Sequence, residues 1–143
     1  MYKFKAVFLS ALMAMSFSLA SPGFAQVLSK SVPVDGTNVG ITLRGYDHEC
    51  RNEASVALGK LFCVKVSAKT TDAVWLKDLK LEKFDAVMPA HRHGMVTRAQ
   101  INQVGPGEYL IKGLKLHMAG EWEFKLSLLH GKSPAQVAIP MKL

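Results

Sequence analysis

The sequence lacks the motifs of the common enzyme classes. Its 143 residues contain no Gly-x-Ser-x-Gly elbow, no His-Glu-x-x-His helix and no glycine-rich phosphate loop. Ser133 lies close to His130, but both fall in a turn-like segment before Pro134, and no acid is evident to orient a catalytic base. The chain is therefore predicted not to be an enzyme.

The sequence also lacks a basic run, although its formal net charge is +7. Its lysines are spread singly, whereas nucleic-acid and heparin sites show stacked basic residues. Typical positions are Lys65, Lys69, Lys77, Lys80 and Lys83. This spacing predicts a solvated surface and no nucleic-acid partner.

The N-terminal apolar run is too short for a membrane span. Ala6 to Leu19 is uncharged over about 14 residues, against the roughly 20 that a spanning helix needs. It follows Lys3 and Lys5 and precedes small residues, the pattern of a cleaved secretory signal. We predict a signal peptide at residues 1–25, with cleavage after Ala25 or alternatively after Ala20. The mature protein would be periplasmic or secreted, with no membrane span and a charge near +5.

Cysteine is scarce, and the only two are Cys50 and Cys63. In an exported chain they are expected to form a disulfide. The closed loop of 14 residues would contribute about 3 kcal/mol to stability in the chain-entropy model. A minor alternative is that His48 and both thiolates bind a metal, but thiolates are hard to keep reduced in an oxidising compartment.

The rest of the chain has no repeat, no low-complexity segment and no convincing long helix. Short alternating runs separated by Gly, Pro, Asn and Asp are typical of β-structure. Strands are expected over 39–43, 61–66, 96–104, 108–111, 121–128 and, at an edge, 135–139. Residues 73–81 fit neither period cleanly and are interpreted as a strand, with a helical turn as the alternative. We predict one all-β domain over 26–143, an immunoglobulin-like antiparallel β-sandwich of seven to eight strands with Trp122 in its core. Cysteines so close in sequence cannot be the widely spaced inter-sheet pair of antibody domains, and are expected to join adjacent strands or a strand to a loop.

One stretch carries a candidate metal site. Met88-Pro89-Ala90-His91-Arg92-His93-Gly94-Met95 places two thioethers and two imidazoles around a proline and a glycine. This donor set favours copper, above all Cu(I). In an extended strand His91, His93 and Met95 would share a face, while Pro89 turns Met88 towards it and Gly94 permits a bend.

His117 and Met118, between two expected strands, are further candidate ligands. His48 and His130 are interpreted as loop residues. The alternative is that the methionines fill the core and the histidines bond to loop backbone or solvent.

The order of these motifs resembles a known family. The pattern consists of Met88-Pro89, His91-x-His93-Gly94, Gly107-x-Tyr109 and Met118-x-Gly120-x-Trp122. It resembles the YtkA-like domain, which is related in outline to FixH-type proteins, over roughly residues 61–139. The resemblance implies an exported or membrane-anchored immunoglobulin-like sandwich, with several members associated with copper handling or cytochrome oxidase assembly. This sequence departs from the pattern in lacking a retained anchor and in carrying His91 where related sequences often have Met or another residue of small to medium size.

Two functions follow as hypotheses. The first is an exported protein that binds a copper ion through the His/Met cluster, for sequestration or delivery. The second is a metal-free envelope interaction or assembly module without catalytic activity, whose partner would be another envelope protein.

Overall fold

The computed structural model describes residues 26–143, so the predicted signal peptide lies outside the described residues. This part of the chain contains nine strands and one short 3₁₀ helix, η1 (Trp75–Asp78). The strands are β1 (Val27–Val34), β2 (Thr37–Tyr46), β3 (Leu61–Lys69), β4 (Leu79–Met88), β5 (His93–Gly94), β6 (Gln100–Gly105), β7 (Glu108–Lys115), β8 (Glu121–His130) and β9 (Ser133–Lys142).

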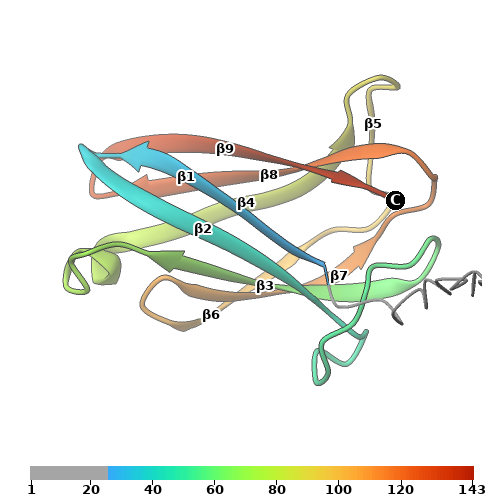
Figure 1. Ribbon diagram of the computed structural model, residues 1–143, viewed down its shortest axis with the longest axis horizontal. Helices are drawn as coiled ribbons and strands as arrows, with labels where there is room; N and C mark the ends of the chain where they lie inside the picture. The colour runs from blue at the N-terminus through green and yellow to red at the C-terminus, as the bar shows by residue number, and fades with distance from the viewer. Residues whose placement is uncertain (1–25) are drawn as a thin grey trace, which may run out of the picture.

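The strands form two antiparallel sheets that pack face to face. One sheet has the order β1-β2-β3-β7-β6 and the other the order β5-β4-β8-β9 (Figure 1). The all-β sandwich expected from the sequence is therefore confirmed. Its nine strands exceed the expected seven to eight, because the two-residue β5 and the exposed edge strand β1 have too few buried positions to stand out in the sequence.

The strand order is that of an immunoglobulin-like sandwich. The run β2-β3-β7-β6 corresponds to strands A, B, E and D of that fold, and β5-β4-β8-β9 corresponds to C′, C, F and G. β1 is an additional strand beside β2, and it approaches β9 of the other sheet, where Lys30 Nζ donates a hydrogen bond to the carbonyl of Ala138 at 2.8 Å.

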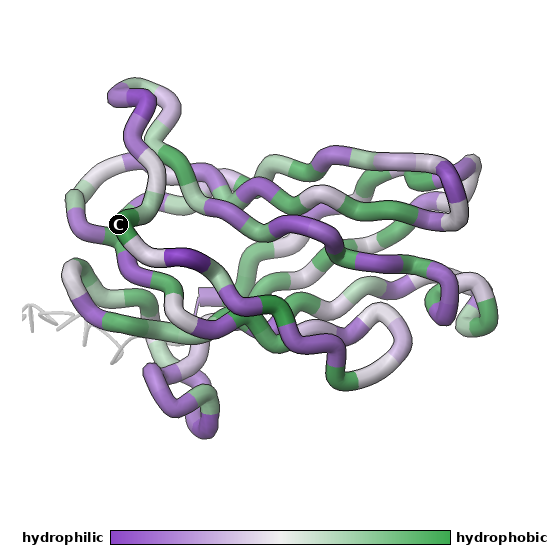
Figure 2. The backbone as a smooth tube through the Cα atoms, turned by 180° about the vertical axis from the view of Figure 1, so that it is seen from behind, coloured by the Kyte–Doolittle hydropathy of each residue, from purple (hydrophilic) through white to green (hydrophobic). Residues whose placement is uncertain are grey.

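The core lies between the two sheets and is built from alternate residues. Along β8 the inward side chains are buried and their neighbours are more exposed, as the period-two pattern predicts. The inward residues of β8 are Trp122, Phe124, Leu126 and Leu128, each at most 1% exposed. Alternation of apolar and polar residues also runs along β2 and β9 (Figure 2). Trp122 is thus a core residue, as expected.

Three expected boundaries differ from the structure. The strand expected over 73–81 is wrong before Leu79, because η1 covers Trp75–Asp78 and β4 begins only at Leu79. The strand expected over 96–104 is β6, which begins at Gln100. The last strand was expected to lie between Pro134 and Pro140, but β9 includes both prolines. Proline has no backbone N–H to donate. β9 is an edge strand, so its prolines can occupy positions whose N–H would point away from β8 and bond to no strand.

A disulfide anchors the long β2–β3 connection. Cys50 in this loop is bonded to Cys63 on β3, with 5.4 Å between their Cα atoms, which confirms the predicted pairing of a strand with a loop. Both sulfurs are used, so the alternative thiolate metal site is wrong. Asp47 orders the same loop by accepting hydrogen bonds from the backbone of Arg51 and Asn52. The loop ends beside β7, where the Gly59 N–H donates to the carbonyl of Leu116 at 2.8 Å.

Candidate metal centre

The His/Met stretch forms a hairpin between β4 and β5. The Met88 carbonyl accepts a hydrogen bond from the His91 N–H at 3.2 Å, which closes a turn with Pro89 at its second position. Arg92 then takes a left-handed conformation with φ of +53°. The sequence-based picture of one extended strand with a bend at Gly94 is therefore wrong at His91, because the reversal occurs at Pro89–Arg92 and Gly94 belongs to β5.

The two histidines of the hairpin remain close together. His91 in the turn and His93 on β5 are both exposed, and their ring centroids are 6.4 Å apart with 25° between the ring planes. An imidazole nitrogen binds a metal ion at about 2 Å, so two rings that share one ion have centroids no more than about 6.5 Å apart. The spacing is at the upper end of this range, and both side chains are free to adjust around an ion.

Met88 lies next to His93 across the hairpin. The two residues are directly opposed in the β4–β5 pairing, so their side chains share one face of the sheet, with Cβ atoms about 5 Å apart. Met88 is only 2% exposed, which places its side chain at the end of the core. The hairpin therefore combines a buried thioether with an exposed imidazole on the same face.

Trp122 on the neighbouring strand β8 lies beside Met88. Val87 of β4 pairs with Glu123 of β8, so the next residue, Met88, lies opposite Trp122. Trp122 pairs in turn with Met141 on β9. Met141 is 4% exposed. Met141 lies in this row because of the β8–β9 register, a long-range relation that no local sequence pattern contains.

The connection between β7 and β8 brings His117 and Met118 to the same end. The Trp122 indole N–H donates a hydrogen bond to the Met118 carbonyl at 2.9 Å, and the His117 ring meets the indole edge-on with 5.8 Å between centroids. Gly120 in this connection lies against the Met88 side chain. His117 and Met118 are both half-buried, and the His117 Nδ1 is buried without a hydrogen-bond partner in the described part of the chain.

Met95 is the remaining methionine of residues 26–143. It follows β5 directly, its N–H donates to the Ala86 carbonyl at 3.2 Å, and its side chain packs half-buried against the core. All four methionines of residues 26–143 therefore belong to segments at one end of the sandwich, where β4 and β9 end and β8 begins (Figure 1). His91, His93 and His117 lie at this end with them.

His130 is held at the opposite end by other contacts. Its Nδ1 bonds to Asp35 Oδ2 at 2.8 Å and its ring stacks on Trp75 at 3.9 Å. Ser133 Oγ donates to the other oxygen of Asp35 at 2.9 Å, so serine and histidine contact the carboxylate and not each other. The hydrogen bonds from His130 and then Ser133 lower the pKa of Asp35. His48 lies exposed in the β2–β3 loop.

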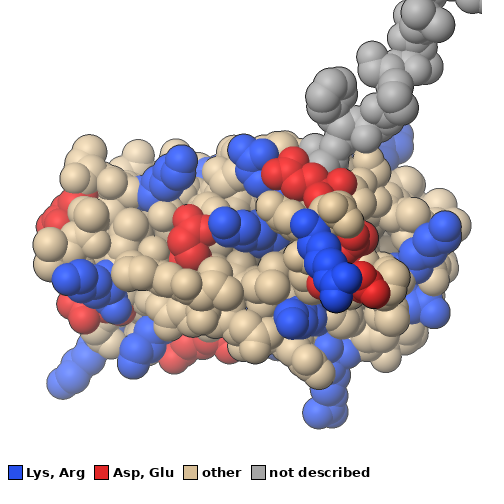
Figure 3. Space-filling model, turned by 90° about the horizontal axis from the view of Figure 1, so that it is seen from below, with Lys and Arg blue, Asp and Glu red and all other residues tan. Residues whose placement is uncertain are grey.

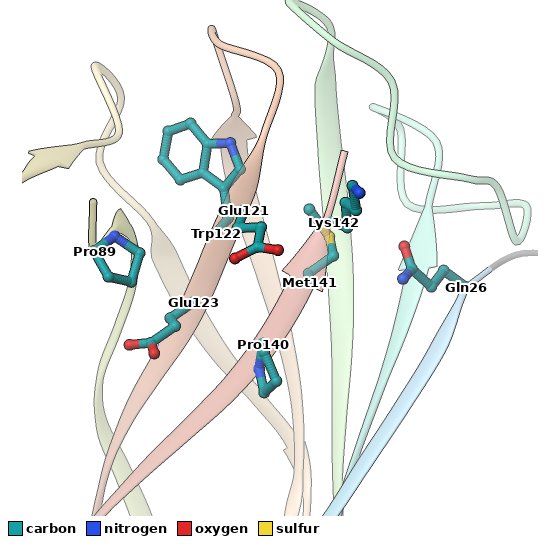
Figure 4. A pocket seen from close by; sticks show the side chains of 8 residues that line it. All are labelled: Gln26, Pro89, Glu121, Trp122, Glu123, Pro140, Met141 and Lys142. Atoms are coloured by element: carbon teal, nitrogen blue, oxygen red, sulfur yellow. The ribbon is translucent and has the colours of Figure 1, made fainter. Parts of the chain in front are cut away.

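A shallow pocket of about 270 Å³ borders the hairpin (Figure 4). It is lined by Pro89, by Trp122 and Met141, and by the carboxylates of Glu121 and Glu123. Hard carboxylate oxygens suit magnesium, calcium or manganese better than copper. Glu121 and Glu123 alternate with the inward Trp122 on β8, and Lys142 lines the same pocket, so the pocket adds no soft ligand to the candidate centre.

Basic residues form no single patch on the face seen in Figure 3, where they alternate with acidic ones. Several are paired: Lys65 with Glu108 at 3.4 Å and Arg44 with Glu53 at 3.4 Å. Such pairs fit the solvated surface expected from the spacing of the lysines.

Within residues 26–143, no three side chains drawn from His, Cys, Asp and Glu gather as metal ligands. A site at the methionine-rich end would therefore draw on thioether sulfur. The same residues include no helix that is long and apolar enough to cross a bilayer. The chain has no significant match to a family model, to a curated protein or to a solved structure.

Proposed function

We propose that this protein binds a copper ion at the methionine-rich end of the sandwich, for sequestration or delivery in the periplasm or outside the cell. His91 and His93 provide imidazole nitrogen, and Met88 and Met95 provide thioether sulfur. The observation that carries the proposal is that every described methionine belongs to the end of the sandwich that contains Trp122, together with three histidines.

Core packing alone does not account for this distribution. Methionine fills irregular gaps anywhere in a core, yet the opposite end of this sandwich contains none. Imidazole accepts several transition metals, whereas neutral thioether sulfur narrows the preference to copper, especially Cu(I). The exposure of both hairpin histidines gives an ion access from solvent.

The test is copper titration of the purified protein under both oxidising and anaerobic reducing conditions. We expect one tight site per chain. The double variant His91→Ala, His93→Ala should weaken the binding of both oxidation states by about tenfold or more, because losing two direct ligands should cost at least as much as losing a group that only orients a ligand.

His130→Ala is the matched control, since it removes an imidazole at the far end and should leave copper affinity unchanged. Equal affinity in the wild type and in the hairpin double variant would reject the proposal. Elemental analysis of protein isolated from its native compartment should find stoichiometric copper.

A further inference from the structure

We infer that the inner wall of this site, made by Met88, His117 and Met118 beside Trp122, selects the reduced ion Cu(I). The inference rests on the proposed function, because it concerns the oxidation state of the ion bound there. It uses residues other than the exposed histidines, so an experiment can reject the inference without rejecting the proposed function, and the reverse.

His117 offers a free ligand atom. Its Nδ1 is buried and has no hydrogen-bond partner within residues 26–143. Buried polar atoms are normally paired, and a neutral imidazole binds a metal through its unprotonated nitrogen. The edge-on contact of the ring with Trp122 fixes its position. A metal ion would give this nitrogen the partner that it lacks.

Gly120 brings the segment that carries His117 and Met118 next to the Met88 side chain. A Cβ at this residue would lie 2.9 Å from the Met88 methyl carbon, so the absence of a side chain lets the β7–β8 connection approach Met88. The bond from the Trp122 indole to the Met118 carbonyl holds the start of that connection. Met88 thus faces His93 on one side and the segment of His117 and Met118 on the other.

The chemistry of this wall suits a monovalent soft ion. It offers one imidazole and two neutral thioethers, whereas Cu(II) prefers tetragonal nitrogen and oxygen ligands. Burying an ion is costly, and the cost is smaller for a single positive charge than for two. An aromatic face within about 6 Å of a cation also stabilises it. Exposed His91 and His93 accept either oxidation state, so the selectivity comes from the inner residues.

The test uses Ag(I), a soft monovalent ion that does not change oxidation state, and tryptophan fluorescence. The chain has two tryptophans, so Trp75→Phe leaves Trp122 as the only reporter. We expect stoichiometric Ag(I) to quench Trp122. Met88→Leu and His117→Ala should each lower Ag(I) and Cu(I) affinity by about tenfold or more, because losing a direct ligand should cost at least as much as losing a group that only orients one. Both should leave Cu(II) affinity within about twofold, because Cu(II) depends on the exposed imidazoles.

Met88→Leu nearly conserves volume, a change that cores tolerate, and Met141→Leu is its matched control on the other side of Trp122 and should keep wild-type quenching. Unchanged Ag(I) affinity and quenching in Met88→Leu and His117→Ala would overturn the inference, while the effect of the hairpin double variant would still support the proposed function. If the double variant binds Cu(II) normally but Met88→Leu loses Ag(I), the inner wall is supported and the histidine pair is rejected. No binding of either metal to the parent protein would overturn both.

Discussion

Gly120 lies directly against the terminal methyl group of Met88 and has a φ of +133°. The contact joins the β7–β8 connection to the β4–β5 hairpin, two segments that come from different parts of the chain. Both features of this residue, its conformation and its lack of a side chain, require glycine. The relative position of the two groups of candidate ligands therefore depends on one glycine.

Gly120→Ala should destabilise the protein. The φ of +133° strains any residue with a side chain, at a cost of about 1–3 kcal/mol, and the new methyl group would press on Met88. Urea unfolding followed by circular dichroism gives the free energy of unfolding. Gly94→Ala is the control, because the nearest atom to its new Cβ is 3.8 Å away and its φ is not positive. Equal stability of the two variants would contradict the prediction.

Loss of the disulfide should lower the free energy of unfolding by about 3 kcal/mol, since Cys50–Cys63 closes a short loop in the unfolded chain. The double variant Cys50→Ser, Cys63→Ser can be compared with the wild type by urea unfolding in metal-free buffer. Adding reductant to the wild type should lower its free energy of unfolding by the same amount, and it should not change the free energy of unfolding of the variant. A wild type that is as stable reduced as oxidised would show that the bond contributes nothing.

Acid should weaken the end of the sandwich that contains Asp35. Its hydrogen bonds from His130 and Ser133 lower its folded pKa, so the fold favours the charged carboxylate. This contribution is fully present above the ordinary aspartate pKa of about 3.9 and is lost as the pH falls through the lower folded value. Asp35→Asn should therefore show a smaller fall in melting temperature between about pH 5 and pH 3 than the wild type.

Asp78→Asn is a suitable control for this profile. Asp78 lies on η1 at the same end, and within residues 26–143 it makes no side-chain hydrogen bond or ion pair. Its variant should retain the wild-type pH dependence. If Asp35→Asn also follows the wild-type profile, the bond to His130 does not contribute to acid stability.

Bound metal should stabilise the folded protein. Free Ag(I) at a hundred times its dissociation constant adds about 2.7 kcal/mol when the unfolded chain does not bind it, so thermal unfolding should shift upwards and a chelator should reverse the shift. Met88→Leu should reduce the shift. A melting temperature that does not respond to Ag(I) in the wild type would argue against a site formed by folding.

Local patterns predicted much of the fold. The alternation from Glu121 to Leu128 identified β8, because a strand with one face on the core has to alternate. Gly105-Pro106-Gly107 identified the β6–β7 turn, where Gly107 has a φ of +68°. The bounds of β9 were harder to predict. A proline normally interrupts a central strand, but an edge strand such as β9 tolerates it.

The candidate site was predicted less completely. The sequence showed that His91, His93 and Met88 were close along the chain, but not that the turn would place His91 outside the strand. The position of Gly120 against Met88 and the level of Met141 beside Trp122 result from sheet register and loop packing. Both are long-range relations, which no local pattern contains.

The four methionines differ in their shelter from solvent, and this has a consequence for oxidative damage. Met88 and Met141 are nearly inaccessible, whereas Met95 and Met118 are partly exposed. Peroxide should therefore convert Met95 and Met118 to sulfoxides first, adding a polar oxygen to each, while the buried sulfurs of Met88 and Met141 survive. Oxidation would thus proceed in stages, and at the first stage a sulfoxide reductase would need to reach only the two partly exposed methionines.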